Sequence, residues 1–508
     1  MPTRVAGPPP ALLGIDLGTS SVKVVVLDLD GRMQAVASAT YPVENPRPRW
    51  AETDPVLWWR AVVAAVQEAV ASSRTAPVAI GLSGQMHGLV ATGGDGAPLR
   101  PAMLWSDARA VDQLARYREL PDPVRARLRN PLTPGMAGPM LAWLAQHEKR
   151  TYASVRWALQ PKDWVRARLT GAFLAEPSDA SATLLYDIFG DTWDADVVAA
   201  LGLNPELLAP LLPSSGQQAG ELLPEAAREL GLEAGIPVAA GAGDTAAAAL
   251  GSGLLDPTHA QLTIGTGAQI VTPATRPKVP SIEDLDPATH LYRAATDTGW
   301  YSMAAILNGG LALDWARRLL GASWAELYAA AATPPEADDP LFLPHLNGER
   351  TPYLDPSMRG AWVGLGPRHD RTRLLRAALE GVALAVRDAL ECLRRPGTPL
   401  DDLRLAGGGS TDTAWRQLLS DVLGSTLRAV DVSAASGRGA AVLGARAAGL
   451  IDEQALLGRL ATVPEPSATP RADVAAYYTG RYELFRRRVE SLRRDESTEA
   501  SAAAEGRV

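Results

Sequence analysis

The first candidate for chemistry is a polar turn near the start of the chain, Asp16-Leu17-Gly18-Thr19-Ser20. Backbone N–H groups in a tight turn, with Thr and Ser hydroxyls beside them, can surround a phosphate chain. Asp16, at the end of the preceding apolar segment, could hold Mg²⁺ directly or through water, because this ion keeps several waters and uses one or two carboxylates. An Asp that only caps the turn would give the same pattern. The turn alone leaves both interpretations open.

A second turn of this kind, Gly265-Thr266-Gly267, follows the apolar segment 260–264. Gly-Thr-Gly is common in loops, so by itself it indicates little. Two matching turns in two halves of one chain, however, could face each other and hold one polyphosphate. The sequence contains no Gly-Lys dipeptide and no G-x-G-x-x-G stretch, so a Walker A loop and the dinucleotide fingerprint are excluded. Together the two turns favour a different kind of phosphate site.

A candidate general base, Asp244, lies in the segment Ala240-Gly241-Ala242-Gly243-Asp244-Thr245, between a predicted strand and a helix of small residues. Asp is also a preferred helix N-cap, which would explain the position structurally. Phosphoryl transfer requires a carboxylate within hydrogen-bond reach of the attacking hydroxyl. The glycines would let a substrate approach the backbone closely. The hypothesis is that Asp244 accepts the proton of that hydroxyl.

Two further segments carry groups suited to a sugar. Gln85, Met86 and His87 follow a predicted strand and combine donors and acceptors with an apolar surface. In Trp105-Ser106-Asp107-Ala108-Arg109, the indole could stack on a sugar while Asp107 and Arg109 bind hydroxyls. A lone His is more often structural, and an Asp–Arg ion pair at a helix start would equally explain the second segment.

The elements that must position these groups follow from hydrophobic periodicity. The chain opens with three antiparallel strands, followed by a helix over 55–71 and a strand over 78–82. In the second half, a strand over 403–406 ends in Gly407-Gly408-Gly409-Ser410, and a helix begins near Thr413. Each half thus holds a strand that ends in a Gly-Thr turn and leads into another strand. This weak internal repeat predicts two domains that meet near 251–257, where Gly, Ser and Pro cluster.

Bulk composition supports this organisation. A chain of 508 residues exceeds one hydrophobic core. The net charge of −8 argues against a nucleic-acid or anionic-membrane partner, and a single cysteine, Cys392, favours a reducing compartment. We see no secretory signal and no apolar stretch of about 18 residues, so a cytoplasmic protein is expected. Residues 1–11 and 494–508 are predicted to be disordered.

Taken in order from about Leu12 to about Leu450, these segments resemble the FGGY family of sugar kinases, and within it most closely the bacterial xylulokinases. Gly84-Gln85-Met86-His87-Gly88 is the most specific match. Arg373, Ser106 and Ala108 depart from the usual pattern. The other matching segments are 14–23, 105–109, 161–165, 243–244, 265–267, 348–352, 360–365 and 407–410.

The resemblance implies an α/β fold of two actin-like ATPase (ribonuclease H-like) domains with an interdomain cleft. Residues 12–253 would form the N-terminal FGGY domain with the sugar and the catalytic Asp, and 254–493 the C-terminal domain with ATP. Asp244 would be the base, and Asp16 would position Mg²⁺. The sugar would contact Gln85, Met86, His87, Trp105, Asp107, Arg109 and Asp244. The nucleotide would contact Gly18, Thr19, Ser20, Lys23, Gly265, Thr266, Gly267, Asn308, Gly408, Gly409 and Ser410.

The resemblance further implies phosphorylation of D-xylulose to D-xylulose 5-phosphate, and a homodimer, since dimers are common in the family. Three alternatives stay open. The acceptor could be another ketose or polyol, such as ribulose, a pentitol or a deoxy-sugar. The chain could be a non-kinase actin-like ATPase, or a sugar sensor without turnover, against which the presence of Asp244 argues.

Overall fold

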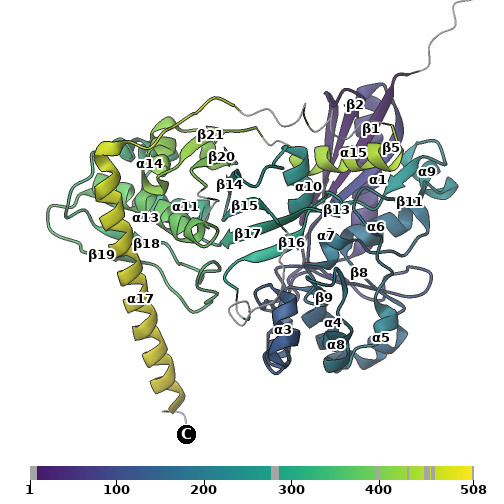
Figure 1. The fold of residues 1–508 in the computed structure, drawn as a ribbon, viewed down its shortest axis with the longest axis horizontal. Helices are drawn as coiled ribbons and strands as arrows, with labels where there is room; N and C mark the ends of the chain where they lie inside the picture. Colours follow the sequence, from purple (N-terminus) through teal and green to yellow (C-terminus); the bar gives the residue numbers. More distant parts are fainter. Residues whose placement is uncertain are drawn as a thin grey trace, which may run out of the picture.

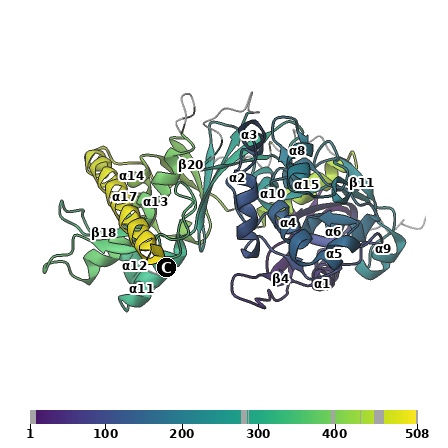
Figure 2. The same ribbon diagram turned by 90° about the horizontal axis from the view of Figure 1, so that it is seen from below.

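The computed structural model describes residues 8–275, 285, 287–394, 398, 400–431, 434–450, 458 and 464–505 (Figure 1). Two mixed β-sheets dominate this part of the chain, and they lie in different halves of the molecule in both views (Figures 1 and 2). Of the predicted tails, residues 1–7 and 506–508 lie outside the described residues. Helices cover the sheets, so the chain is of the α/β class that its periodicity predicts.

The first sheet has seven strands in the order β11-β12-β5-β1-β2-β3, with β13 (Ala242–Gly243) pairing with β5. The three opening strands form the predicted antiparallel meander, and β5 pairs in parallel with β1. Helix α1 (Pro55–Ser73) begins at the N-cap Asp54 and ends at Arg74 in the left-handed region. The strands are β1 (Pro10–Leu17), β2 (Ser21–Asp28), β3 (Met33–Thr40), β5 (Ala76–Gly84), β11 (Gln218–Glu221) and β12 (Pro237–Ala239).

The second sheet has six strands in the order β16-β17-β15-β14-β20-β21. As in the first sheet, a strand leads through a Gly-Thr turn into an antiparallel neighbour, here β14 into β15, which confirms the predicted repeat. Long apolar faces of α13 (Arg371–Glu391) and α14 (Thr413–Leu423) pack into the core beside it. The strands are β14 (Ala260–Ile264), β15 (Ala268–Ala274), β16 (His290–Arg293), β17 (Trp300–Ile306), β20 (Asp402–Ala406) and β21 (Thr426–Ala429).

Helix α15 (Ala435–Ala447) follows the second sheet in sequence but packs on the first, against β1, β5 and the helix α10 (Asp244–Gly251) (Figure 1). Glycines permit this close approach. A β-carbon at Gly81 would clash with the Ala440 carbonyl, and one at Gly439 would clash with the Ala247 carbonyl. The predicted division at 253/254 therefore does not hold for α15, because the backbone contact with the first sheet is made by a later segment.

A long segment between β5 and β11 adds small elements around the first sheet and reaches the second. Asn130 hydrogen-bonds through its side chain to both the N–H (2.9 Å) and the carbonyl (3.0 Å) of Leu291 in β16. Arg293 N–H donates to Ser181 Oγ at 3.0 Å. The segment contains β6 (Val90–Thr92), β7 (Ala102–Met103), α2 (Leu114–Arg118), α3 (Asp122–Leu128), α4 (Ala137–His147), α5 (Lys149–Ser154), β8 (Trp157–Leu159), α6 (Pro161–Thr170), α7 (Pro177–Ala180), β9 (Tyr186–Asp187), β10 (Thr192–Trp193) and α8 (Ala195–Ala200).

The last element, α17, runs over Ala475–Glu505. The structure continues this helix through 494–505, a segment predicted from sequence as part of a disordered tail, where Ala and Glu are strong helix formers. At the other end, β1 begins at Pro10, inside the predicted disordered N-terminus. In the described part of the chain, every helix is too short or too polar to cross a membrane. The remaining elements are β4 (Glu52–Thr53), α9 (Pro224–Leu230), α11 (Gly310–Leu319), α12 (Trp324–Ala330), β18 (Leu341–Leu343) and β19 (Ala361–Val363).

Candidate active site

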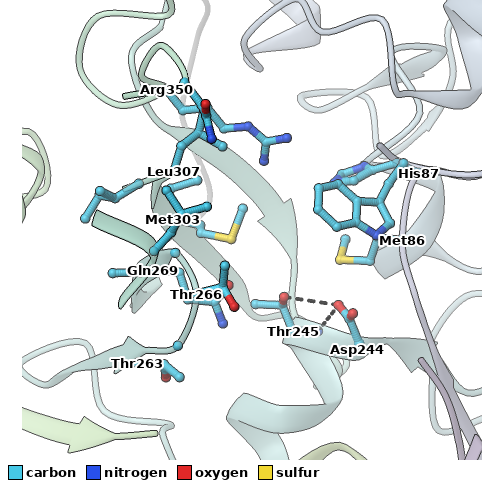
Figure 3. Close-up of a pocket in the computed structure, with 18 residues that line it drawn as sticks. Met86, His87, Asp244, Thr245, Thr263, Thr266, Gln269, Met303, Leu307 and Arg350 are labelled. Carbon is cyan, nitrogen blue, oxygen red and sulfur yellow. Dashed lines mark hydrogen bonds between the residues drawn. The ribbon is translucent and has the colours of Figure 1, made fainter. Parts of the chain in front are cut away.

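A cavity of about 550 Å³ lies between the two halves (Figure 3). The first half contributes Met86, His87 and Trp105 from the segment after β5, and Asp244 from the start of α10. The second half contributes the turn Gly265–Gly267, the end of β17, and Arg350. The structure thus brings some residues predicted for a sugar together with one of the two turns predicted for phosphate, whereas Asp16 and the turn Gly18–Ser20 do not line this cavity. The cavity is also lined by Thr245, Thr263, Ala268, Gln269, Met303, Ala305, Ile306, Leu307, Leu311 and Asn347.

Asp244 is the first residue of α10, and Gly243 occupies the N-cap position. Its Oδ1 accepts hydrogen bonds from Thr245 N–H at 2.6 Å and from Thr245 Oγ1 at 3.2 Å (Figure 3). Burial raises its pKa to about 6, and the charge of Asp16 adds to this shift. A carboxylate with this pKa is ionised at neutral pH yet basic enough to accept a proton. Asp244 therefore has the placement and the basicity of a general base.

Asp16 lies at the end of β1, where Ser83 Oγ donates to its Oδ1 at 3.0 Å. Burial raises its pKa, while this hydrogen bond and the charge of Lys23 act in the opposite direction. Because Asp16 raises the pKa of Asp244, the two carboxylates lie near each other. The described residues contain no cluster of three or more metal ligands. Two carboxylates fit Mg²⁺ that arrives with a nucleotide, which supplies the remaining oxygens.

The turn after Asp16 is fixed by side chains around it. Gly18 N–H donates to Ser21 O at 2.9 Å, and the Gly18 carbonyl accepts from the Tyr41 hydroxyl and from Gln85 Nε2 at 3.2 Å. Trp105 Nε1 donates to Thr19 Oγ1 at 2.9 Å. Gln85 is buried against the turn and does not line the cavity, so the structure gives it a bracing contact in place of the predicted sugar contact.

His87 presents one defined nitrogen to the cavity. Its backbone has φ of 74°, and its Nδ1 lies 2.8 Å from the Ala182 carbonyl. A carbonyl only accepts, so Nδ1 carries the proton. Burial lowers the His87 pKa to about 4, and the charge of Arg350 acts in the same direction. The ring is therefore neutral at pH 7, and its Nε2 is an acceptor.

Asp107 and Arg109 pair with each other and do not line the cavity. The Arg109 guanidinium contacts both Asp107 oxygens, reaches Glu52 at 2.7 Å and lies 3.5 Å from the centre of the Trp50 ring. Asp107 also accepts from Ala51 N–H at 2.7 Å. The predicted alternative, an ion pair at a helix start, thus describes these residues, and the pair holds the loop that carries Trp105.

A second cavity, of about 900 Å³, lies on the other side of the turn Gly265–Gly267. It is lined by Gly265, Thr266, Gly408 and Gly409 together with Trp315, Trp324 and Tyr328, so it combines backbone donors with aromatic surface. Gly310 N–H and Leu311 N–H at the start of α11 donate to the carbonyls of Gly265 (2.9 Å) and Thr266 (2.8 Å). This arrangement suits a nucleotide whose phosphates pass the turn toward Asp244. The side chain of Ser410 lies outside the described residues.

Asn308 is fully buried and does not line this cavity. Its Nδ2 donates to the Gly348 carbonyl at 2.7 Å and to Glu349 Oε2 at 3.1 Å. The side chain therefore holds the loop that carries Arg350 and does not take the predicted position in the nucleotide cavity.

A group of fully buried charges under the active site escapes prediction from sequence. Lys162 Nζ lies 2.5 Å from Asp163, 3.5 Å from Glu176 and 3.3 Å from Asp179. Burial raises the pKa of Asp179 well above its usual value. Glu176 Oε1 accepts from Ser178 Oγ at 2.7 Å, and Ser178 Oγ accepts from Gly243 N–H at 3.0 Å. The group thus supports the residue just before Asp244; the segment Pro161–Val165 was the available signal.

Comparison with known proteins assigns the family. Residues 11–251 match the N-terminal domain of the FGGY family of carbohydrate kinases, and residues 260–448 match its C-terminal domain. The chain belongs to this family. It is an FGGY carbohydrate kinase, with ATP and a sugar as the substrates that the family implies. The predicted family and its actin-like ATPase fold are both confirmed.

Similar proteins include kinases of more than one sugar. The xylulose kinase of Escherichia coli is 35% identical over 94% of this chain and 99% of its own. The structure of a "xyloylose kinase" from Brucella ovis matches with a TM-score of 0.87 and 33% identity, covering 95% of this chain and 99% of the other. A gluconate kinase from Lactobacillus acidophilus matches with a TM-score of 0.88 and 25% identity, covering 95% and 98%. The comparisons therefore support an FGGY sugar kinase without assigning its acceptor.

Proposed function

We propose that this kinase transfers the γ-phosphate of ATP to the C5 hydroxyl of D-xylulose and forms D-xylulose 5-phosphate. The observation that carries the proposal is the position of Asp244. Its carboxylate lines the same cavity as Met86 and His87 on one side and the turn Gly265–Gly267 on the other. Similarity to xylulose kinases over nearly the whole chain supports D-xylulose as the acceptor.

In the proposed reaction, the sugar occupies the 550 Å³ cavity with its C5 hydroxyl against Asp244. The nucleotide occupies the 900 Å³ cavity, and its terminal phosphate passes the turn at Thr266, which lines both cavities. Asp244 accepts the proton of the C5 hydroxyl as the hydroxyl oxygen attacks the γ-phosphorus, and the bond from this phosphorus to ADP breaks so that ADP leaves. The backbone N–H groups of the two turns then hold the phosphate oxygens.

The proximity and burial of Asp16 and Asp244 support these two carboxylates as the residues that would hold a nucleotide-bound Mg²⁺. Mg²⁺ would neutralise part of the phosphate charge when bound. Asp16 is accordingly the proposed metal contact, and Lys23 on β2 contributes a positive charge beside it. Closure of the two halves would exclude water, so that the sugar rather than water receives the phosphate.

The test is a coupled assay of ADP release with D-xylulose, ribulose, pentitols, deoxy-sugars, gluconate and glycerol as acceptors. The highest kcat/KM is expected with D-xylulose, and the product should carry its phosphate on C5 by NMR. If another acceptor is phosphorylated and D-xylulose is not, the protein is still a sugar kinase, but the proposed acceptor is wrong. ATP consumption that no sugar changes would support a non-kinase ATPase, and sugar binding without turnover would support a sensor.

A further inference from the structure

Arg350 is the one Lys or Arg among the described residues that line the sugar cavity. It comes from the loop between β18 and β19 in the second half and faces the first half across the cavity. Its guanidinium extends toward His87 (Figure 3) and lies 5.6 Å from the centre of the Trp105 ring. A cation is therefore held at the sugar side of the cavity.

The neighbouring carboxylate does not neutralise this cation through a hydrogen bond. Glu349 Oε1 accepts from Leu307 N–H at 2.7 Å, and Oε2 accepts from Asn308 Nδ2 at 3.1 Å. Thr351 Oγ1 donates to the Ala288 carbonyl at 2.8 Å, so the backbone on both sides of Arg350 is fixed. Within the described part of the chain, the Arg350 guanidinium itself makes no hydrogen bond or ion pair.

A guanidinium carries five N–H donors and no acceptor, and the half-buried guanidinium of Arg350 directs its donors into the cavity without a protein acceptor. Burial in the cavity wall lowers the pKa of Arg350, while the charges of Tyr292 and Glu349 act in the opposite direction. Oxygen atoms of a bound ligand would supply the missing acceptors. Because the backbone on both sides of Arg350 is fixed, a ligand must bind the guanidinium close to its present position.

Beside the donors of Arg350, His87 offers a hydrogen-bond acceptor. Its Nδ1 proton is committed to the Ala182 carbonyl, and Nε2 takes no hydrogen bond within the described residues. One end of the cavity therefore presents a group that only donates next to a group that only accepts. A matching ligand has an oxygen that only accepts beside a hydroxyl that can donate.

An open-chain 2-ketose has this pattern at one end. Its C2 carbonyl only accepts, and its C1 hydroxyl can donate. Figure 3 shows Asp244 and Arg350 at opposite ends of the cavity, so a sugar with its C5 hydroxyl at Asp244 directs C1 and C2 toward Arg350 and His87. Reduction of C2 to a hydroxyl, as in a pentitol, removes the atom that is purely an acceptor.

We propose that Arg350, paired with His87, is a specificity residue that binds the hydroxyketone end of the sugar and selects ketoses over polyols. The inference rests on the proposed function, because the direction of the sugar depends on its C5 hydroxyl meeting Asp244. Arg350 donates to the C2 carbonyl, and His87 Nε2 accepts from the C1 hydroxyl.

The experiment compares wild type, Arg350→Met and Arg350→Lys on D-xylulose and on its two reduced forms, xylitol and D-arabinitol. Polyols that turn over too slowly are measured as competitive inhibitors. Arg350→Met is expected to lose about 10- to 100-fold in kcat/KM for D-xylulose, the size of a lost charge-assisted hydrogen bond. The constants for the polyols and the KM for ATP should change far less. Arg350→Lys, which keeps the charge without the fork, should lose less than Arg350→Met.

Arg368→Met is the matched control, because Arg368 is exposed, belongs to the same half and pairs with Asp338 away from the cavity. It should behave as wild type. Equal losses on ketose and polyols, or full activity of Arg350→Met on D-xylulose, would overturn the role of Arg350. If wild type does not phosphorylate D-xylulose at all, the proposed function fails instead, so the two failures are distinguishable.

Discussion

The two phosphate turns share a strand–turn–strand plan but differ in chemistry. The turn after β1 follows a carboxylate, Asp16, and is braced by the side chains of Tyr41, Gln85 and Trp105. The turn after β14 has no carboxylate, and its carbonyls are tied to the backbone of α11. Asp244 belongs to the first half as well. In the proposed mechanism, the first half therefore supplies the carboxylates for metal binding and proton transfer, while the second supplies backbone donors and the surface for the nucleotide.

The largest expected effect tests the charged half. Asp244→Asn should lower kcat about 10²- to 10⁴-fold, because a neutral amide cannot accept the proton of the attacking hydroxyl. Steady-state kinetics and thermal unfolding would show activity lost with the fold retained. Asp256→Asn is a matched control, since Asp256 is exposed and bonds only its local turn. Near-full activity of Asp244→Asn would show that this residue is structural.

The second prediction concerns pH. Asp244 acts as a base only when ionised, so kcat/KM should rise with pH through about 6 and then level off. Because the charge of Asp16 raises the pKa of Asp244, Asp16→Asn should move this rise to lower pH. It should also cost about 10- to 100-fold in Mg²⁺ affinity or activity, as for other groups that orient a metal. An unchanged pH profile would contradict the coupling of the two carboxylates.

Two glycines of the turn Gly265–Gly267 test the role of the second half, which supplies backbone donors. A β-carbon at Gly267 would lie 2.5 Å from the Ile306 carbonyl, whereas one at Gly265 would meet no protein atom within 4 Å. Gly267→Ala should therefore lower the melting temperature, and Gly265→Ala should leave it unchanged while raising the KM for ATP several-fold. An unchanged KM for ATP in Gly265→Ala would remove this turn from the nucleotide site.

The smallest expected effect tests whether Gln85 supports the turn at Gly18 or contacts the sugar. Gln85→Met removes one hydrogen bond to Gly18 O, and it also removes a buried Oε1 that has no partner. The two changes oppose each other, so the free energy of unfolding should change by less than about 1.5 kcal/mol. The KM for D-xylulose should stay near that of wild type. A large rise in this KM would restore the sugar contact that the sequence predicts.

Strands and turns of this protein could be predicted from sequence because their signals are local. The alternation of β1 to β3, the two Gly-Thr turns and the position of Asp244 all follow from residues within a few positions of one another. The direction of a side chain depends on distant partners, and this is where prediction was incomplete. Gln85 points to Gly18, Arg109 to Glu52 and Asn308 to Glu349.

Two features could not be assembled from local signals alone, although the segment 161–165 resembles the family. The buried charges around Lys162 come together from α6 and α7, and their connection to Asp244 runs through the backbone of Gly243. The loop sequence around Arg350 does not by itself indicate a role. Only the position of Arg350 opposite His87 in the cavity indicates that it binds the sugar. Both depend on tertiary packing across the molecule.

Helix α15 follows the second sheet in sequence but packs on the first, and this affects the order in which the protein can fold during synthesis. A ribosome releases all seven strands of the first sheet long before residues 435–447. Until then the face of β1 and β5 around Gly14 and Gly81 has nothing to pack against, and its apolar surface stays open to water. The first half of the chain therefore completes its core only after the second has been synthesised. A fragment that stops at residue 253 should aggregate when expressed alone, and adding residues 435–447 in trans should rescue it.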